Sequence, residues 1–187
     1  MSATPAKGGF AKRYKELAAR SRVPLGFLLL VVYAIFSRPS RERLIAGSLV
    51  ALCGLALRAW ATGHLDKNRE LCTGGPYAHT RNPLYLGTLL VAAGLAVASR
   101  ELWLAVLFAA AFGLIYLPAI ELEEQHLRAL FPEYAAYASQ VPRLGVRLRP
   151  SVSPERFRLA LYRKNQEYQA AAGYLVGLAL LAWKISR

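Results

Sequence analysis

The stretch "TGGPYAHTRNPLYLG", residues 73–87, sets a polar segment directly against an apolar one. Two glycines and a proline punctuate its first half as a loop, and Pro83 fits the first turn of a helix. The chain then continues without a charge as "LYLGTLLVAAGLAVA", residues 84–98. A polar loop that enters an uncharged apolar helix predicts the point where the chain passes from water into a membrane.

The rest of the chain repeats this alternation of apolar runs and polar segments. Its 187 residues are 55% hydrophobic, with a mean hydropathy of +0.27 and a formal net charge of +13. A soluble domain rarely combines so much apolar residue with so few charges. We therefore predict an all-α fold, a polytopic membrane helix bundle of about five transmembrane helices that forms a single domain over residues 1–187. The apolar cores of the predicted spans are residues 24–36, 44–61, 84–98, 102–120 and 171–183.

The basic residues predict how this bundle is oriented. The three segments on the N-terminal side of the predicted membrane hold 17 Lys and Arg residues, and the three on the other side hold six. The first three are residues 1–23, 62–83 and 121–170, and the others are residues 37–43, 99–101 and 184–187. The positive-inside rule predicts a cytoplasmic N-terminus in an inner (cytoplasmic) membrane, with 62–83 and 121–170 building a site that faces the cytoplasm. Cations beside apolar runs meet membrane lipids, so we predict no nucleic-acid partner. Arg58, inside the second span, is expected to extend toward the membrane surface.

The polar end of residues 73–87 is suited to binding an anion. Arg81 and Asn82 lie beside a helix N-terminus, where unpaired backbone donors favour negative charge. Gly87, one turn further, allows a ligand or a neighbouring helix to approach closely. Because Tyr and Arg also serve as interfacial anchors, a purely anchoring role is the alternative.

A second polar cluster, "ELEEQHLRALFPEYAAYASQVPR", occupies residues 121–143. Three carboxylates, Glu121, Glu123 and Glu124, directly follow an apolar span, where charges without partners are costly. We expect at least one of them to face a buried cation or a bound ligand, and Glu124 to pair with Arg128 four residues on. The alternative is a solvated helix start just beyond the membrane.

The remaining polar residues carry weaker signals. The three histidines have no tight metal-ligand spacing, so we predict no metal site, and both cysteines are interpreted as free thiols. Residues 154–170 predict an interfacial helix that leads into the last span, with its polar side chains facing headgroups rather than the site.

Together, "GPYAHTRNPLYLG" and "EEQHLRALFPEYAAYASQVPR" resemble the isoprenylcysteine carboxyl methyltransferase and phospholipid methyltransferase group of integral membrane enzymes. The resemblance covers about residues 45–145. It implies S-adenosylmethionine as the cofactor and a lipophilic, membrane-borne methyl acceptor. It also implies cofactor contacts from Tyr77, His79, Arg81, Asn82, Pro83, Tyr85, Gly87, Glu123, Glu124, Leu127, Tyr134 and Tyr137, and catalytic roles for Arg81, Glu123, Glu124 and Arg143. The chain departs from the prenylcysteine branch at Asn82, where that branch has a titratable His.

The chemistry of methyl transfer leaves two acceptors open. Glu123 or Glu124 would hold the cofactor near its cationic groups. An acceptor carboxylate, as in a prenylcysteine, would be positioned by Arg81 with Arg143 and would need no base. An amine headgroup of a lipid must lose a proton, which makes a glutamate the base. The rival functions are an NADPH-dependent sterol-type membrane reductase and a non-enzymatic membrane scaffold or transport protein.

Overall fold

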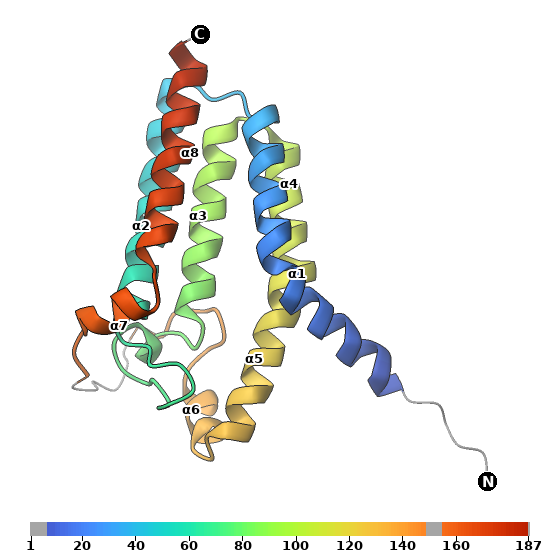
Figure 1. The fold of residues 1–187 in the computed structure, drawn as a ribbon, viewed down its shortest axis with the longest axis vertical. Helices are drawn as coiled ribbons and strands as arrows, with labels where there is room; N and C mark the ends of the chain where they lie inside the picture. The colour runs from blue at the N-terminus through green and yellow to red at the C-terminus, as the bar shows by residue number, and fades with distance from the viewer. Residues whose placement is uncertain (1–6, 149–154, 187) are drawn as a thin grey trace.

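The computed structural model describes residues 7–148 and 155–186, without the side chains of residues 7–12, 22 and 23. Within these ranges every regular element is helical, which confirms the predicted all-α class (Figure 1). The elements are α1 (Lys7–Phe36), α2 (Arg41–Thr62), η1 (Gly75–Ala78), α3 (Pro83–Ser99), α4 (Leu102–Ala111), η2 (Phe112–Tyr116), α5 (Leu117–Leu130), α6 (Tyr134–Gln140), α7 (Leu159–Lys164) and α8 (Tyr168–Ser186). The predicted segments 1–23 and 121–170 lie partly outside the described residues.

All five predicted apolar segments are helical, but they differ as membrane spans. By length and composition, Arg41–Thr62, Leu102–Leu130 and Tyr168–Ser186 can each cross a membrane. α1 is a fourth candidate, bent by 52° where Pro24 removes a backbone hydrogen bond. α3 has 17 residues and rises about 25 Å, somewhat less than a typical hydrocarbon core of about 30 Å. The polytopic bundle is thus confirmed, with three to four full-length candidate spans and one shorter helix.

Glycines bring α2 and α3 into backbone contact. A Cβ at Gly47 would lie 2.3 Å from the carbonyl oxygen of Gly94, and a Cβ at Gly54 would lie 2.6 Å from that of Gly87. Each helix therefore presents two glycines seven residues apart to the other. Small residues at an interface let helix backbones approach closely in lipid.

A π-turn, η2, joins α4 to α5 within one long helix. The N-terminal part of α1 packs beside it: the Tyr14 hydroxyl donates to the Leu114 carbonyl at 2.5 Å, and Lys15 Nζ lies 2.5 Å from Glu121 Oε1. These contacts fix α5, which carries the predicted carboxylates. Glu121 therefore faces a cation on α1 and not the predicted site.

The C-terminal segment corrects two predictions. Residues 155–158 are not helical, and a non-helical turn separates α7 from α8. The described part of 154–170 is therefore not one interfacial helix. Arg58 also does not extend to the surface. Its guanidinium lies 2.6 Å and 3.0 Å from the two carboxylate oxygens of Glu167. This buried carboxylate neutralises the guanidinium within the protein, so Arg58 does not need to reach water.

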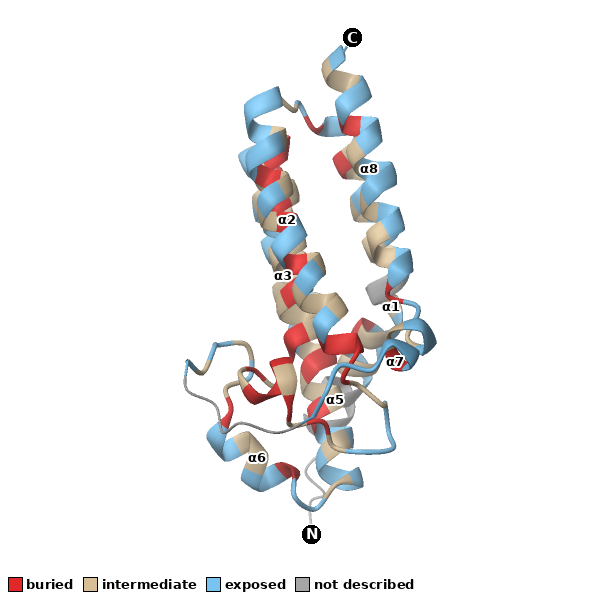
Figure 2. Cartoon of the chain, turned by 90° about the vertical axis from the view of Figure 1, so that its left-hand side faces the viewer, coloured by how far each residue is buried: buried red, intermediate tan, exposed pale blue. Residues whose placement is uncertain are grey.

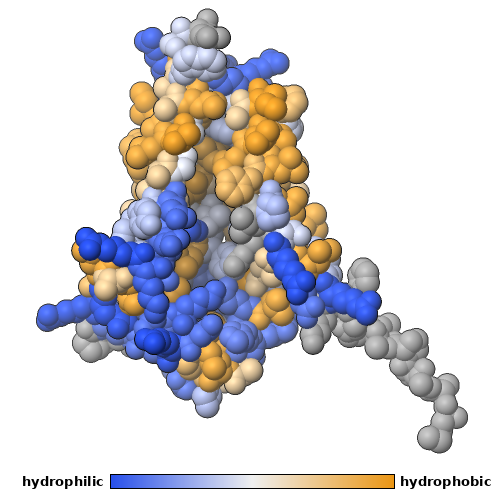
Figure 3. All heavy atoms as spheres, viewed as in Figure 1, coloured by the Kyte–Doolittle hydropathy of each residue, from blue (hydrophilic) through white to orange (hydrophobic). Residues whose placement is uncertain are grey.

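The surface separates an apolar band from two polar ends. Most buried residues lie at the end that holds η1 and α5, whereas the outward faces of α2 and α8 are exposed (Figure 2). On the face seen in Figure 3, apolar residues gather along the middle of the bundle, with hydrophilic residues beyond them at both ends. This is the surface of a membrane-embedded bundle. The cytoplasmic orientation stays a prediction.

Candidate active site

Backbone hydrogen bonds bring the two motifs of the sequence together. The loop before α3 lies against the segment that follows α6: Arg81 N donates to the Pro142 carbonyl at 2.9 Å, and Arg147 N donates to the His79 carbonyl at 2.8 Å. The Thr80 hydroxyl adds a bond of 3.3 Å to the Arg143 carbonyl. The bonded residues of the two segments are more than sixty positions apart in the sequence, so the site exists only in the folded chain.

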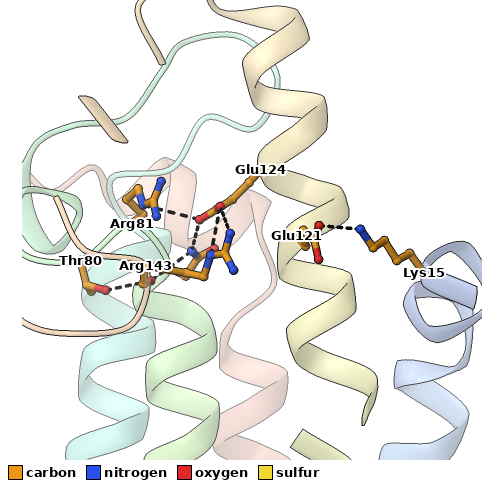
Figure 4. A network of polar contacts seen from close by, with 7 residues as sticks. Lys15, Thr80, Arg81, Glu121, Glu124 and Arg143 are labelled. Carbon is orange, nitrogen blue, oxygen red and sulfur yellow. Dashed lines mark hydrogen bonds and ion pairs between the residues drawn. The ribbon is translucent and has the colours of Figure 1, made fainter. Parts of the chain in front are cut away.

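Glu124 is the centre of a buried ionic network (Figure 4). Its Oε2 accepts bonds of 3.1 Å and 2.8 Å from Nε and Nη2 of Arg143, and its Oε1 lies 3.5 Å from Arg81 Nε. The Asn82 amide donates to Oε1 at 3.2 Å and to the Arg143 carbonyl at 3.1 Å. The carboxylate raises the pKa of Arg143, chiefly through this hydrogen bond. Arg128 instead lies over the Tyr134 ring at 5.8 Å, so its predicted pairing with Glu124 is wrong.

Beside this network lies a cavity of about 510 Å³, here called the polar cavity. Its volume is in the range that holds small-molecule ligands. It lies between the loop before α3, helix α5 and helix α6. Nine of the thirteen predicted site residues line it: Tyr77, Arg81, Asn82, Pro83, Tyr85, Glu123, Leu127, Tyr134 and Tyr137.

The other four predicted residues lie outside the polar cavity. Glu124 and Arg143 are behind it, where they neutralise each other and hold the Arg81 guanidinium. Gly87 faces α2, since a Cβ there would lie 2.5 Å from Arg58 Cγ. The Nδ1 of His79 lies 2.8 Å from the Arg147 carbonyl, so this ring ties two loops together.

One wall of the polar cavity was not marked by any motif. It is formed by the loop after α2: Leu65, Lys67, Asn68, Glu70, Leu71 and Cys72. The predicted polar segment 62–83 contains all of these positions but does not single them out. Glu155 fastens this loop from outside, accepting a bond of 3.2 Å from Gly74 N and contacting the Cys72 thiol at 3.6 Å. Burial raises the pKa of Cys72, so this thiol stays protonated and unreactive.

Aromatic side chains complete the polar cavity. Burial raises the pKa of Tyr77 well above its ordinary value, and also that of Tyr137, whose hydroxyl donates to the Tyr77 carbonyl at 2.7 Å. Both phenols are therefore neutral packing surfaces. Rings of this kind suit a planar heterocycle.

A second cavity of about 530 Å³, here called the apolar chamber, extends from the polar cavity into the membrane band. Helices α1, α3 and α4 and the π-turn η2 supply its apolar walls, which include Phe27, Leu29, Leu30, Val91, Ala92, Leu95, Phe108 and Phe112. Along α3 the chamber runs from Leu84 to Leu95, about 16 Å of helix. The π-turn places Tyr116 at its polar end, where this ring packs edge-on against Tyr85 at 6.1 Å.

The two cavities meet, and the residues that line both are Leu65, Lys67, Leu84, Tyr85 and Glu123. At this junction the Tyr85 hydroxyl donates to Glu123 Oε2 at 2.9 Å. Among the described residues no cation pairs with Glu123, whereas Glu124 pairs with two arginines and Glu121 with Lys15. The arrangement can hold a polar ligand and an apolar one with their reacting ends in contact.

A family model described as phospholipid methyltransferase matches residues 22–134, more than half of the chain. The chain belongs to this family. The resemblance stated from the two motifs is thereby confirmed.

Two curated relatives match parts of the chain. The cobalt-zinc-cadmium resistance protein CzcN of Cupriavidus metallidurans is 38% identical over 93 residues, which cover 49% of this chain and 43% of the relative. The nickel-cobalt-cadmium resistance protein NccN of Alcaligenes xylosoxydans xylosoxydans is 32% identical over 136 residues, covering 72% and 59%. This member of the phospholipid methyltransferase family thus spans about half the length of these relatives. No solved structure matches it. Within residues 7–148 and 155–186, no group of three or more His, Cys, Asp or Glu side chains could hold a metal ion.

Proposed function

We propose that this chain transfers a methyl group from S-adenosylmethionine in the polar cavity to a lipophilic acceptor in the apolar chamber. The observation that carries the proposal is the junction, because two cavities of different polarity share Tyr85 and Glu123. Such an arrangement lets a water-soluble cofactor and a membrane-borne acceptor react without either leaving its own phase. An in-line displacement needs this alignment of the two ligands.

The donor set of the polar cavity fits the cofactor. Arg81, held from behind by Glu124, would bind a carboxylate in a charge-assisted pair. Glu123 and the rings of Tyr77 and Tyr137 would face the cationic groups and the heterocycle. When bound, S-adenosylmethionine supplies an electrophilic methyl group on a sulfonium.

The charge at the junction favours an amine as the acceptor. Glu123 is half-buried and has no ion-pair partner among the described residues, so a cationic amine headgroup would supply the missing counter-charge. Glu123 would take the proton of this amine, which leaves the nitrogen able to accept the methyl group that the cofactor supplies, and Tyr85 would keep the carboxylate oriented toward the chamber.

A carboxylate acceptor is the second candidate, and Lys67 is the observation that favours it. Lys67 lines both cavities and could offset an added negative charge there. Arg58 cannot take this role, because Glu167, Thr88 and the Leu84 carbonyl already occupy its guanidinium.

The proposal is tested on the full chain purified in detergent. Calorimetric titration should detect S-adenosylmethionine and its demethylated product and not NADPH. Transfer of a radiolabelled methyl group is then measured into phosphatidylethanolamine and into a prenylcysteine analogue. We expect label in the amine lipid, and Glu123→Gln should lower kcat about 100-fold or more.

The matched control is Glu121→Gln, on the same helix but paired with Lys15, which should keep the wild-type rate. If neither S-adenosylmethionine nor its demethylated product bound to a folded sample, the proposed methyltransferase activity would be overturned. Label confined to the prenylcysteine analogue and lost in Lys67→Ala would select the second candidate.

A further inference from the structure

Three chain segments meet at the end of the bundle opposite the polar cavity. They are the turn between α1 and α2, the turn between α3 and α4, and the last turn of α8. Arg38 N donates to the Ser99 carbonyl at 3.0 Å, which joins the two turns. Lys184 Nζ donates to the carbonyls of Ala34 and Ser37, each at 2.8 Å, which joins α8 to the end of α1. The geometry of this end is therefore set by hydrogen bonds.

These segments enclose a hollow of about 490 Å³ that carries a strong positive charge. Three of its seven lining residues are cations, Arg38, Arg100 and Lys184, and none is a carboxylate. Glu101 lies outside the lining, with Oε1 at 3.5 Å from Arg38 Nε. Arg38 keeps 86% of its side chain exposed despite this contact. The hollow is thus open and lacks an internal counter-charge.

Helix capping accounts for only part of this charge. The ammonium of Lys184 is bound to carbonyls at the end of α1, as a cation at a helix C-terminus should be. The guanidinium of Arg38 has no hydrogen bond within residues 7–148 and 155–186, and that of Arg100 has neither a hydrogen bond nor an ion pair there. The guanidinium groups of Arg38 and Arg100, each with several hydrogen-bond donors, are therefore available to a ligand in the hollow.

Ser37 supports the hollow through its backbone. It is 1% exposed, its N donates to the Tyr33 carbonyl at 2.9 Å, and its carbonyl accepts from Lys184 Nζ at 2.8 Å. Its Oγ has no hydrogen-bond partner in the described chain and is itself buried, so the donors open to a ligand in the hollow are the cations.

The position of the hollow indicates where such a ligand comes from. It lies where the apolar band gives way to hydrophilic residues beside the end of α8 (Figure 3). Trp103 and Trp183 are both exposed near it, and amphipathic indole rings gather at the headgroup level of a bilayer. Phe36, in the lining, packs edge-on against Trp103 at 5.4 Å.

We propose that this hollow binds the phosphate of an anionic phospholipid headgroup, at a site separate from the methyl-transfer cavities. Arg38 and Arg100 would hold the phosphate oxygens through charge-assisted bonds, with Lys184 adding charge. A free phosphate ion offers the same oxygens, so the experiment must separate the two sources.

The test uses the full chain, stripped of lipid in detergent and examined by native mass spectrometry. Phosphatidylglycerol and phosphatidylcholine are added separately, and inorganic phosphate is added as a competitor. We expect one phosphatidylglycerol to be retained at least tenfold more tightly than phosphatidylcholine. Arg100→Gln and the double variant Arg38→Gln/Arg100→Gln should abolish that preference, while Arg43→Gln, exposed on the same end but outside the hollow, should keep it.

The outcomes separate cleanly. Displacement of the lipid by millimolar phosphate would support the phosphate site and identify a free anion as an alternative occupant, whereas resistance would support the lipid. Equal retention of both lipids, or wild-type preference in the double variant, would overturn the proposal. Binding of S-adenosylmethionine should be unchanged in all of these variants, which also shows that they are folded.

Discussion

The ion pair between Arg58 and Glu167 gives the sharpest prediction about stability. Only 23% and 9% of the two side chains are exposed, and both carboxylate oxygens are bound. Replacing one member leaves the other buried without a counter-charge, which typically costs about 3–5 kcal/mol. We therefore expect Arg58→Met to lower the free energy of unfolding by about 3–5 kcal/mol.

The two single variants should differ in a predictable order. Arg58→Met leaves the Glu167 carboxylate with no partner among the described residues, whereas Glu167→Met leaves Arg58 bonded to Thr88 Oγ1 at 2.6 Å and to the Leu84 carbonyl at 3.3 Å. Glu167→Met should therefore cost less. In Arg58→Met the Thr88 hydroxyl keeps a hydrogen-bond partner, because it still donates to the Leu84 carbonyl.

The double variant Arg58→Met/Glu167→Met removes both charges and replaces them with apolar groups that suit the interior. We expect its stability to lie within about 1 kcal/mol of wild type, since removing a whole buried pair is often neutral. The assay is equilibrium unfolding in mixed detergent, followed by tryptophan fluorescence, for all four proteins of the cycle. If the double variant lost the sum of the two single losses, the side chains would act independently and the reasoning would be refuted.

Three further predictions use the same preparations. Gly94→Ala places a Cβ 2.4 Å from a carbonyl oxygen of α2, so unfolding should need about 1–3 kcal/mol less, whereas Gly177→Ala, with no atom within 4 Å of the new Cβ, should be neutral or stabilising. Glu124→Gln removes the charge that two guanidiniums share and should cost about 3 kcal/mol in the same assay; wild-type stability would contradict the network. A hydrogen bond from Lys164 lowers the pKa of Asp66, so this pair stabilises the fold above the unfolded pKa of about 4 and stops doing so as the pH falls through the lower folded pKa. The Tm difference between wild type and Lys164→Met should therefore be present at pH 7 and vanish in acid, and an unchanged difference would refute the assignment.

Hydropathy was enough to predict the helices, because a membrane span is a local property of about 20 residues. All five apolar segments are helical, and the turns at residues 37–40 and 100–101 fall within the predicted connections 37–43 and 99–101. The π-turn in "FGLIY", residues 112–116, was not predictable, since these residues suit an ordinary helix equally well. The contact that it makes with α1, the bond from the Tyr14 hydroxyl to the Leu114 carbonyl, joins residues 100 positions apart.

The partners of the buried ion pairs could not be predicted from the local sequence. Arg58 is a basic residue near the end of a span, and the general expectation for such a residue is the membrane surface. Its partner, Glu167, lies 109 residues further along, in a segment interpreted as facing headgroups. Nothing local to either residue marks the pair, because the coupling arises only when α8 packs beside α2 (Figure 1).

The two adjacent carboxylates show the same limit within the site. Glu123 and Glu124 are equivalent in the sequence, and both were assigned to cofactor binding and catalysis. They point to different sides of α5, so the segment after α6 delivers Arg143 to Glu124 alone, while α3 delivers the Tyr85 hydroxyl to Glu123. A carboxylate neutralised by two arginines is a poor base and a poor counterion for a ligand, whereas one bound only by a phenol keeps both abilities. Under the proposed function, Glu124 would therefore support Arg81, and Glu123 is the residue on which the chemistry should depend.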